Sequence, residues 1–132
     1  MTTIYWKRCK TYDEAKDHTG VVYLHEWNGI PIYWGKAHNS TFGGNPRKVD
    51  GVKKNPRYNT GYRHWIDGCL RYGARLYIGK PEGGENLSID EIESSLIAAF
   101  PTEFNGHNDE PSIELIHKGE IPETIRVSLI DE

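Results

Sequence analysis

The stretch that decides the fold is Val21-Val-Tyr-Leu-His-Glu-Trp-Asn-Gly-Ile-Pro-Ile-Tyr-Trp-Gly-Lys-Ala37. Two runs rich in β-branched and aromatic residues flank Asn28-Gly29, the strongest short-range signal for a β-hairpin. A two-residue loop would place Tyr23 opposite Trp34, with Tyr33 on the other face. A three-residue loop that also takes in the preceding tryptophan, with its glycine as a left-handed bulge, would place Tyr23 opposite Tyr33. We predict the three-residue loop.

The segments on either side of this hairpin are less regular. Pro31 cannot donate a hydrogen bond to a neighbouring strand, so its strand is expected at a sheet edge or with that position turned outward. Residues 3–18 predict a short extended piece and then one or two helical turns that begin near Thr11. Residues 39–59 contain repeated Gly, Asn-Pro and Asp-Gly breakers and predict a long loop. That loop is either an arm for a nucleic-acid backbone or a simple linker.

From about Thr60 the apolar residues recur at helical spacing and predict a buried stripe made of Tyr62, Trp65, Ile66, Cys69 and Leu70. This helix is expected to end at Gly73. Arg63 lies at the margin of the stripe, and His64 is expected to point toward solvent. The alternation over residues 74–79 predicts a third strand.

A second helix is expected to open with the capping box Ser88-Ile-Asp-Glu91 and to end before Pro101. Its predicted buried row consists of Ile89, Ile92, Leu96, Ala99 and Phe100. Glu93 falls within that row, where an ionised and unpaired carboxylate would cost on the order of several kcal/mol. Glu93 is therefore expected either to pair with a cation or metal, or to reach water at the edge of the row. Residues 113–117 and 124–130 predict two further short strands.

Composition bounds the interpretation. The 132 residues suffice for a single domain, and four Trp and eight Tyr argue against disorder. No apolar run is long enough to span a bilayer and no signal-peptide pattern is present, so we expect a cytoplasmic, intracellular protein with no membrane partner. Cys9 and Cys69 lack metal-ligand spacing and are expected to be reduced thiols rather than a disulfide or zinc site.

Charge is segregated along the chain. Residues 36–80 hold ten Lys and Arg against two Asp, whereas residues 81–132 hold two against thirteen Asp and Glu. A basic face for phosphates, with an acidic face turned away, is one interpretation, and a solvated surface is the other.

Gly20-Val-Val-Tyr23 followed by Tyr33-Trp-Gly-Lys-Ala37 resembles the GIY-YIG nuclease superfamily, in particular its small stand-alone or restriction-enzyme-like members. The arginine-bearing helix, the third strand, the Glu93 helix and Asn105 follow in that family's order. The resemblance covers about residues 20–105. It implies an α+β fold with a three-stranded antiparallel central sheet flanked by helices. A 1–19 extension and a C-terminal β-hairpin extension over 106–132 would complete the single domain, residues 1–132.

The resemblance implies a metal-dependent endonuclease that hydrolyses DNA. Glu93 would hold Mg²⁺ or Mn²⁺, and Arg63 would fork onto the scissile phosphate, with Arg57 as its rival. Tyr23 would be the general base; because a free tyrosine has a pKa of about 10, it would need a nearby cation such as Lys36 or the metal. Further catalytic roles fall to Tyr33, which would orient water or phosphate, and to Asn105, which would brace the site. The expected nucleic-acid contacts are Lys36, Arg47, Lys48, Lys53, Lys54, Arg57, Arg63 and His64.

Two other classes of function stay open. One is a nucleic-acid-binding module that keeps the fold without turnover, and the other is a protein-interaction domain that uses the acidic C-terminal part. No recognition motif is visible, so sequence specificity would come from the loop, from a homodimer or from another partner.

Overall fold

The computed structural model describes residues 2–37, 41–43, 47–49, 52–54, 61–82, 88–105 and 113–130; within it, only the backbone is described for 47–49, 52–54, 61–63 and 130. The elements in chain order are β1 (Thr2–Cys9), α1 (Tyr12–Ala15), β2 (Val21–Trp27), β3 (Ile30–Ala37), β4 (Arg47–Val49), β5 (Val52–Lys54), α2 (Gly61–Arg71), β6 (Ala74–Glu82), α3 (Ile89–Ala99), β7 (Leu115–Gly119) and α4 (Glu123–Ile130).

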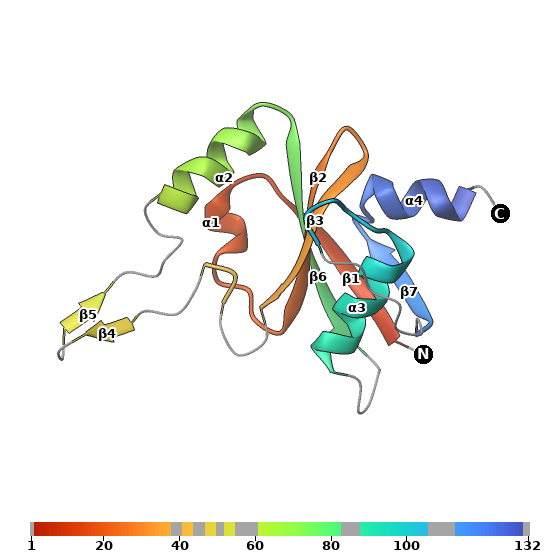
Figure 1. Cartoon of the computed structure of the whole chain (residues 1–132), viewed down its shortest axis with the longest axis horizontal. Helices are drawn as coiled ribbons and strands as arrows, with labels where there is room; N and C mark the ends of the chain where they lie inside the picture. The colour runs from red at the N-terminus through yellow and green to blue at the C-terminus, as the bar shows by residue number, and fades with distance from the viewer. Residues whose placement is uncertain are drawn as a thin grey trace.

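The main sheet has the strand order β3-β2-β6-β1-β7 (Figure 1). The two hairpin strands and the predicted third strand form the antiparallel run β3-β2-β6. The sheet continues beyond this run, because β1 pairs antiparallel with β6 and β7 pairs parallel with β1. The sheet flanked by helices is confirmed, and the three-stranded antiparallel arrangement is wrong. The sheet gains β1 because alternate residues of this strand, Ile4 and Trp6, are apolar and are buried when β1 lies beside β6 with that face covered.

The hairpin turn has two residues, so the predicted three-residue loop is wrong. Asn28 and Gly29 have φ of 54° and 76°, the left-handed pair that this tight turn requires. A bulge between His25 and Glu26 then shifts the register by one residue and places Tyr23 opposite Gly35. The two tyrosines consequently share a face as predicted, but they lie diagonally rather than directly opposite.

The C-terminal β-hairpin is also wrong, because residues 124–130 belong to α4. The buried carboxylate of Glu26 accepts hydrogen bonds from the Thr124 backbone N–H at 2.9 Å and its hydroxyl at 2.7 Å. These bonds satisfy an N–H group that the first helical turn leaves unpaired. Ile125 is fully buried beside them, so a tertiary contact selects the helix over the local β preference.

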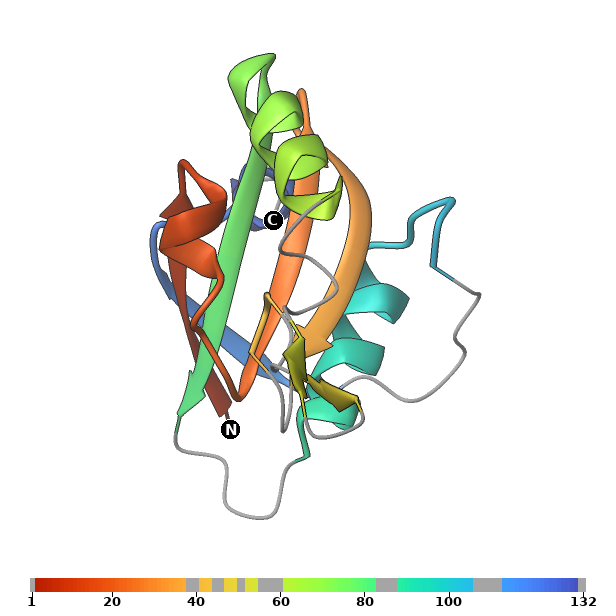
Figure 2. The same cartoon turned by 90° about the vertical axis from the view of Figure 1, so that its left-hand side faces the viewer.

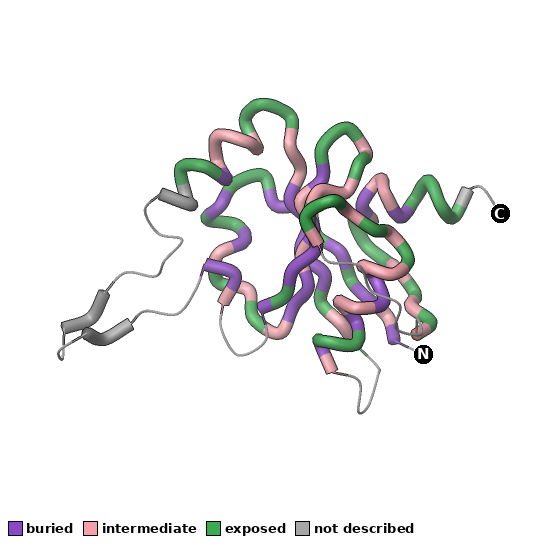
Figure 3. The backbone as a smooth tube through the Cα atoms, viewed as in Figure 1, coloured by how far each residue is buried: buried purple, intermediate pink, exposed green. Residues whose placement is uncertain are grey.

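The helices cover the sheet on both sides, with α1 and α2 on one face and α3 and α4 on the other (Figures 1 and 2). Buried residues run along the strands between these layers, as Figure 3 shows. Each layer has a hydrophobic cluster: Val21, Ala37, Phe42, Ile66, Leu76 and Ile78 lie on the α2 side, whereas Val22, Leu24, Trp34, Ile92 and Leu96 lie on the α3 side. Alternate residues of the hairpin therefore face different helices.

The edge proline, the cap of α3, the 39–59 segment and the two cysteines had each been predicted from local sequence. Pro31 lies on β3, an edge strand of the sheet, as predicted. Ser88 caps α3 through the Glu91 N–H at 3.1 Å, although Ala99, expected to be buried, is exposed. Within residues 39–59, the described part contains the short antiparallel strands β4 and β5 instead of loop alone. Cys9 and Cys69 are free thiols.

Candidate active site at the edge strand

The two hairpin tyrosines lie together on the α2 side of the sheet. The Tyr23 and Tyr33 ring centroids are 6.3 Å apart, and their planes are inclined at 43°. The ring of Tyr23 lies across Gly35 so closely that a Cβ atom there would overlap it. The Tyr-x-Gly spacing of β3 thus has a local physical reason, since only glycine leaves room for the phenol of the neighbouring strand.

Asn105 holds the outer side of β3. Its side-chain amide accepts from the Trp34 N–H at 2.8 Å and donates to the Trp34 carbonyl at 2.9 Å, so it pairs with the edge strand as another strand would. Thr102 donates a hydroxyl hydrogen bond to the same side chain at 2.8 Å. Trp34 is also held from its indole N–H, which donates to the Phe100 carbonyl at 2.8 Å. The loop after α3 therefore fixes the backbone between Tyr33 and Gly35.

Lys36 and Glu93 form an ion pair on the α3 side of the same strand. Lys36 Nζ lies 3.5 Å from Glu93 Oε1 and also pairs with Asp90, one turn earlier on α3. Burial raises the pKa of Glu93, and the ammonium of Lys36 opposes that rise. The hydrogen bond with Asp90 is the main cause of a raised pKa at Lys36. The expectation that Glu93 needs a cation is met by Lys36.

The predicted site residues are therefore brought together as two pairs rather than one cluster. Tyr23 and Tyr33 face α2, whereas Lys36 is opposite Val22 in the register and faces α3. Lys36 is thus directed away from the phenol that it was expected to activate. Both pairs nevertheless belong to the same short stretch of β3, residues 33–36.

The other predicted contacts are less defined. His64 is exposed, as expected. The backbone of Arg63 lies in the first turn of α2, but its side chain is outside the described residues. The same holds for the side chains of Arg47, Lys48, Lys53 and Lys54, and for the whole of Arg57.

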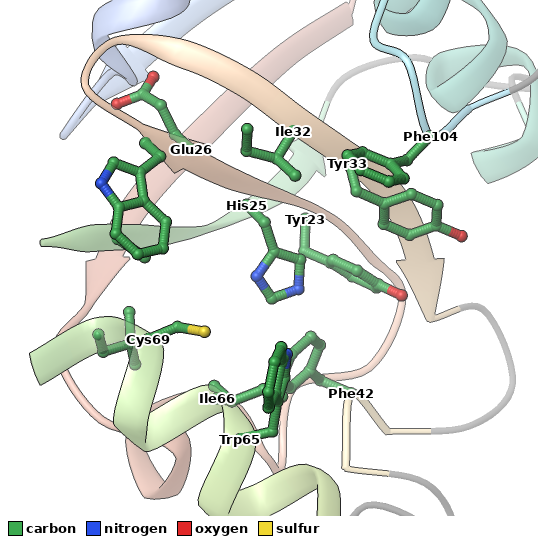
Figure 4. A pocket seen from close by; sticks show the side chains of 13 residues that line it. Tyr23, His25, Glu26, Ile32, Tyr33, Phe42, Trp65, Ile66, Cys69 and Phe104 are labelled. Atoms are coloured by element: carbon green, nitrogen blue, oxygen red, sulfur yellow. The ribbon is translucent and has the colours of Figure 1, made fainter. Parts of the chain in front are cut away.

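A cavity of about 470 Å³ opens between the hairpin and α2, and both tyrosines line it (Figure 4). Sequence reasoning missed its other walls, among them His25, Phe42, Trp65 and Phe104. One signal for it was visible in the helical stripe: Trp65 was predicted to be buried, yet its exposed fraction is 72%. An apolar stripe that is left open indicates a surface that another group can cover.

His25 points from β2 into this cavity toward α2 (Figure 4). Its ring contacts Tyr23 edge-on, with centroids 5.7 Å apart, and lies 6.2 Å from Phe42. Burial lowers the pKa of His25 from 6.5 to about 4, because the apolar surroundings disfavour the charged imidazolium. The imidazole is therefore neutral at physiological pH.

This shift predicts an acid-sensitive fold. Between pH 6.5 and about 4 the unfolded chain protonates this histidine while the folded protein does not, so stability is full above pH 6.5 and falls as the pH drops toward 4. We expect the urea midpoint of unfolding to fall less between pH 7 and pH 4 in His25→Phe than in the wild type, because the variant has no histidine to protonate at this position. His64→Phe, at an exposed histidine, is the control. Identical profiles for His25→Phe and the wild type would contradict the prediction.

The donor set for a metal is small. Among the described residues no group of three His, Cys, Asp or Glu could hold an ion. Asp90 and Glu93 nevertheless converge on one ammonium, which marks a position of negative potential that already takes a cation. A hard ion such as Mg²⁺ is commonly held by one or two carboxylates with waters and phosphate oxygens. The two carboxylates fit such an ion if Lys36 gives way.

The fold and site define an α+β protein with an aromatic cavity on one face of its edge hairpin and a carboxylate–lysine cluster on the other. No family model matches this chain, and neither a curated protein nor a solved structure matches it. Among the described helices, none is long and apolar enough to cross a membrane.

Proposed function

We propose that this chain is a divalent-metal-dependent endonuclease that hydrolyses DNA phosphodiester bonds at the edge of β3. The observation that carries the proposal is that one four-residue stretch of the edge strand joins a tyrosine pair, 6.3 Å apart, to the Lys36–Glu93 ion pair. Phosphodiester hydrolysis needs a base for water and positive charge for the phosphate, and these two pairs supply both kinds of group. The sequence resemblance to GIY-YIG nucleases supports the same chemistry.

In this proposal the two tyrosines, an arginine and Asn105 each act on the water, on the phosphate or on the strand that carries the site. Tyr23 acts as a phenolate that takes the proton from the attacking water; because Lys36 faces α3, the guanidinium of Arg63 or Arg57 would have to stabilise that phenolate. The Tyr33 hydroxyl orients the water or a phosphate oxygen. Arg63, or Arg57 in its place, binds the phosphate through a planar guanidinium. Asn105 acts as a positioning residue, because it fixes the backbone that joins Tyr33 to Gly35.

Glu93, with Asp90 beside it, would hold Mg²⁺ or Mn²⁺. When bound, such an ion supplies charge neutralisation at the phosphate and help for the leaving oxygen. In the metal-free protein Lys36 offsets the repulsion between the two carboxylates, since its ammonium pairs with both. Once displaced, its ammonium becomes available to a backbone phosphate.

The experiment is a nicking assay on supercoiled, linear and branched DNA, with Mg²⁺, Mn²⁺ or a chelator. We expect metal-dependent nicking, and we expect Glu93→Gln to lower its rate about a hundredfold or more, since several kcal/mol of charge stabilisation are removed. Glu91→Gln, an exposed glutamate two residues earlier on α3, is the matched control and should be silent. Absence of nicking with every metal, or full activity in Glu93→Gln, would overturn the proposal.

A DNA-binding module without turnover is the second candidate. One observation favours this second candidate: Tyr23 and Lys36 lie on opposite faces of the hairpin, so the phenol and the Glu93 carboxylate that pairs with Lys36 are not on the same side. Binding that persists in chelator, weakens steeply with salt and is never followed by cleavage would identify this alternative.

A further inference from the structure

We propose that the cavity between the β2–β3 hairpin and α2 binds a single unstacked nucleobase, so that the preferred substrate is DNA with an unpaired nucleotide at the cut. This inference rests on the proposed function and names its substrate class. Size is the first support: about 470 Å³ lies within the range of roughly 300–1,000 Å³ that small-ligand pockets occupy.

The walls of the cavity suit a flat ring. Tyr23 and Tyr33 lie on the sheet side and Trp65 on the α2 side, with Phe104 beside Tyr33 (Figure 4). Trp65 and Phe104 are 72% and 69% exposed. Large aromatic side chains left open on both sides of a hollow are the arrangement on which nucleobases stack, because every base offers a π-face.

The polar group inside the cavity argues against a purely apolar occupant. His25 is neutral at physiological pH and faces the hollow, and in the described part of the chain no hydrogen-bond partner of its ring is found. A neutral imidazole offers one donor and one acceptor. A lipid tail or an aliphatic side chain would leave both unpaired, at a cost in free energy, whereas a base has an apolar face and a polar edge.

The position of the cavity connects the base to the cut. Tyr23 and Tyr33 are walls of the cavity and also the proposed groups for water and phosphate. A base that is held between them and Trp65 cannot remain stacked in a duplex, so its own backbone phosphate is brought to the edge of β3. The free energy needed for this unstacking is lowest for nucleotides in bulges, flaps and single strands, and DNAs that contain them are the expected substrates.

The test measures binding in chelator, without cleavage, by anisotropy of three labelled DNAs of equal length: a matched duplex, the same duplex with one bulged 2-aminopurine, and a single strand. We expect the bulged and single-stranded DNAs to bind about tenfold tighter than the matched duplex, since stacking contributes strongly to single-strand affinity. We also expect quenching of the 2-aminopurine emission on binding.

Trp65→Ala should abolish both the preference and the quenching, and Trp65→Phe should retain part of each. Tyr72→Ala is the matched control, because Tyr72 is 75% exposed at the end of the same helix and is not a wall of the cavity. Equal binding of all three DNAs, or a preference unchanged in Trp65→Ala, would overturn the inference while leaving the nuclease proposal standing. Failure to bind any DNA at low salt would instead overturn the proposed function itself.

Discussion

A Tyr23→Phe variant is expected to nick DNA roughly 10² to 10⁴-fold more slowly than the wild type, the usual contribution of a positioned general base. The change removes only a hydroxyl group. The ring that lies across Gly35 remains, and so do its contacts with Tyr33 and Phe42. The expected loss therefore concerns proton transfer rather than packing, and it should appear in kcat under saturating DNA and metal.

The control is Tyr5→Phe, because Tyr5 is a 42% exposed tyrosine on β1 outside the cavity. It should cleave at the wild-type rate. Both variants should also bind DNA in chelator with the wild-type affinity. If Tyr23→Phe retained more than about a tenth of the activity, Tyr23 would not be the base, and the water would have to be activated by another group.

Trp34→Ala is expected to lower the free energy of unfolding by about 3–5 kcal/mol, the range for truncating a buried tryptophan. Trp34 is fully buried between the hairpin and α3, with its ring 6.2 Å from Trp6 and 6.1 Å from Phe100. The truncation also leaves the Phe100 carbonyl without its indole donor. Since domains of this kind are typically stable by only about 5–15 kcal/mol, the loss should be visible in any urea titration.

Trp65→Ala is the comparison for that titration. The same truncation at a 72% exposed position should change stability by no more than about 0.5 kcal/mol. Similar decreases in unfolding free energy for the two variants would contradict the burial of Trp34 and the exposure of Trp65.

Local patterns were enough to predict most of the elements that carry the site. The period of the apolar residues predicted α2 and α3, and the Ser88 hydroxyl accepts from the Glu91 N–H at the start of α3, as its half of the predicted capping box requires. Asn28-Gly29 predicted the hairpin, and Pro31 predicted its edge position. Each of these signals acts within a few residues, so no knowledge of distant contacts is needed.

Predictions that depended on register or on distant partners were less reliable. The bulge near Glu26 moved the partner of Tyr23 from Trp34 to Gly35, and it thereby restored the shared face of the two tyrosines that the shorter turn alone would have lost. The helix α4 replaced a predicted strand because Glu26, far away in the sequence, bonds Thr124. Neither the bulge nor the carboxylate contact leaves a local pattern.

The sequence by itself determined the hairpin, the two main helices and the chemistry-bearing residue types, because propensity, capping and hydrophobic period act locally. Only the tertiary structure decided that Lys36 and Glu93 meet on the face of β3 opposite to Tyr23, and that Trp65 stays open over a cavity with His25 inside it. Those outcomes depend on which layer covers each face of the sheet, and that is settled by packing among segments distant in the chain.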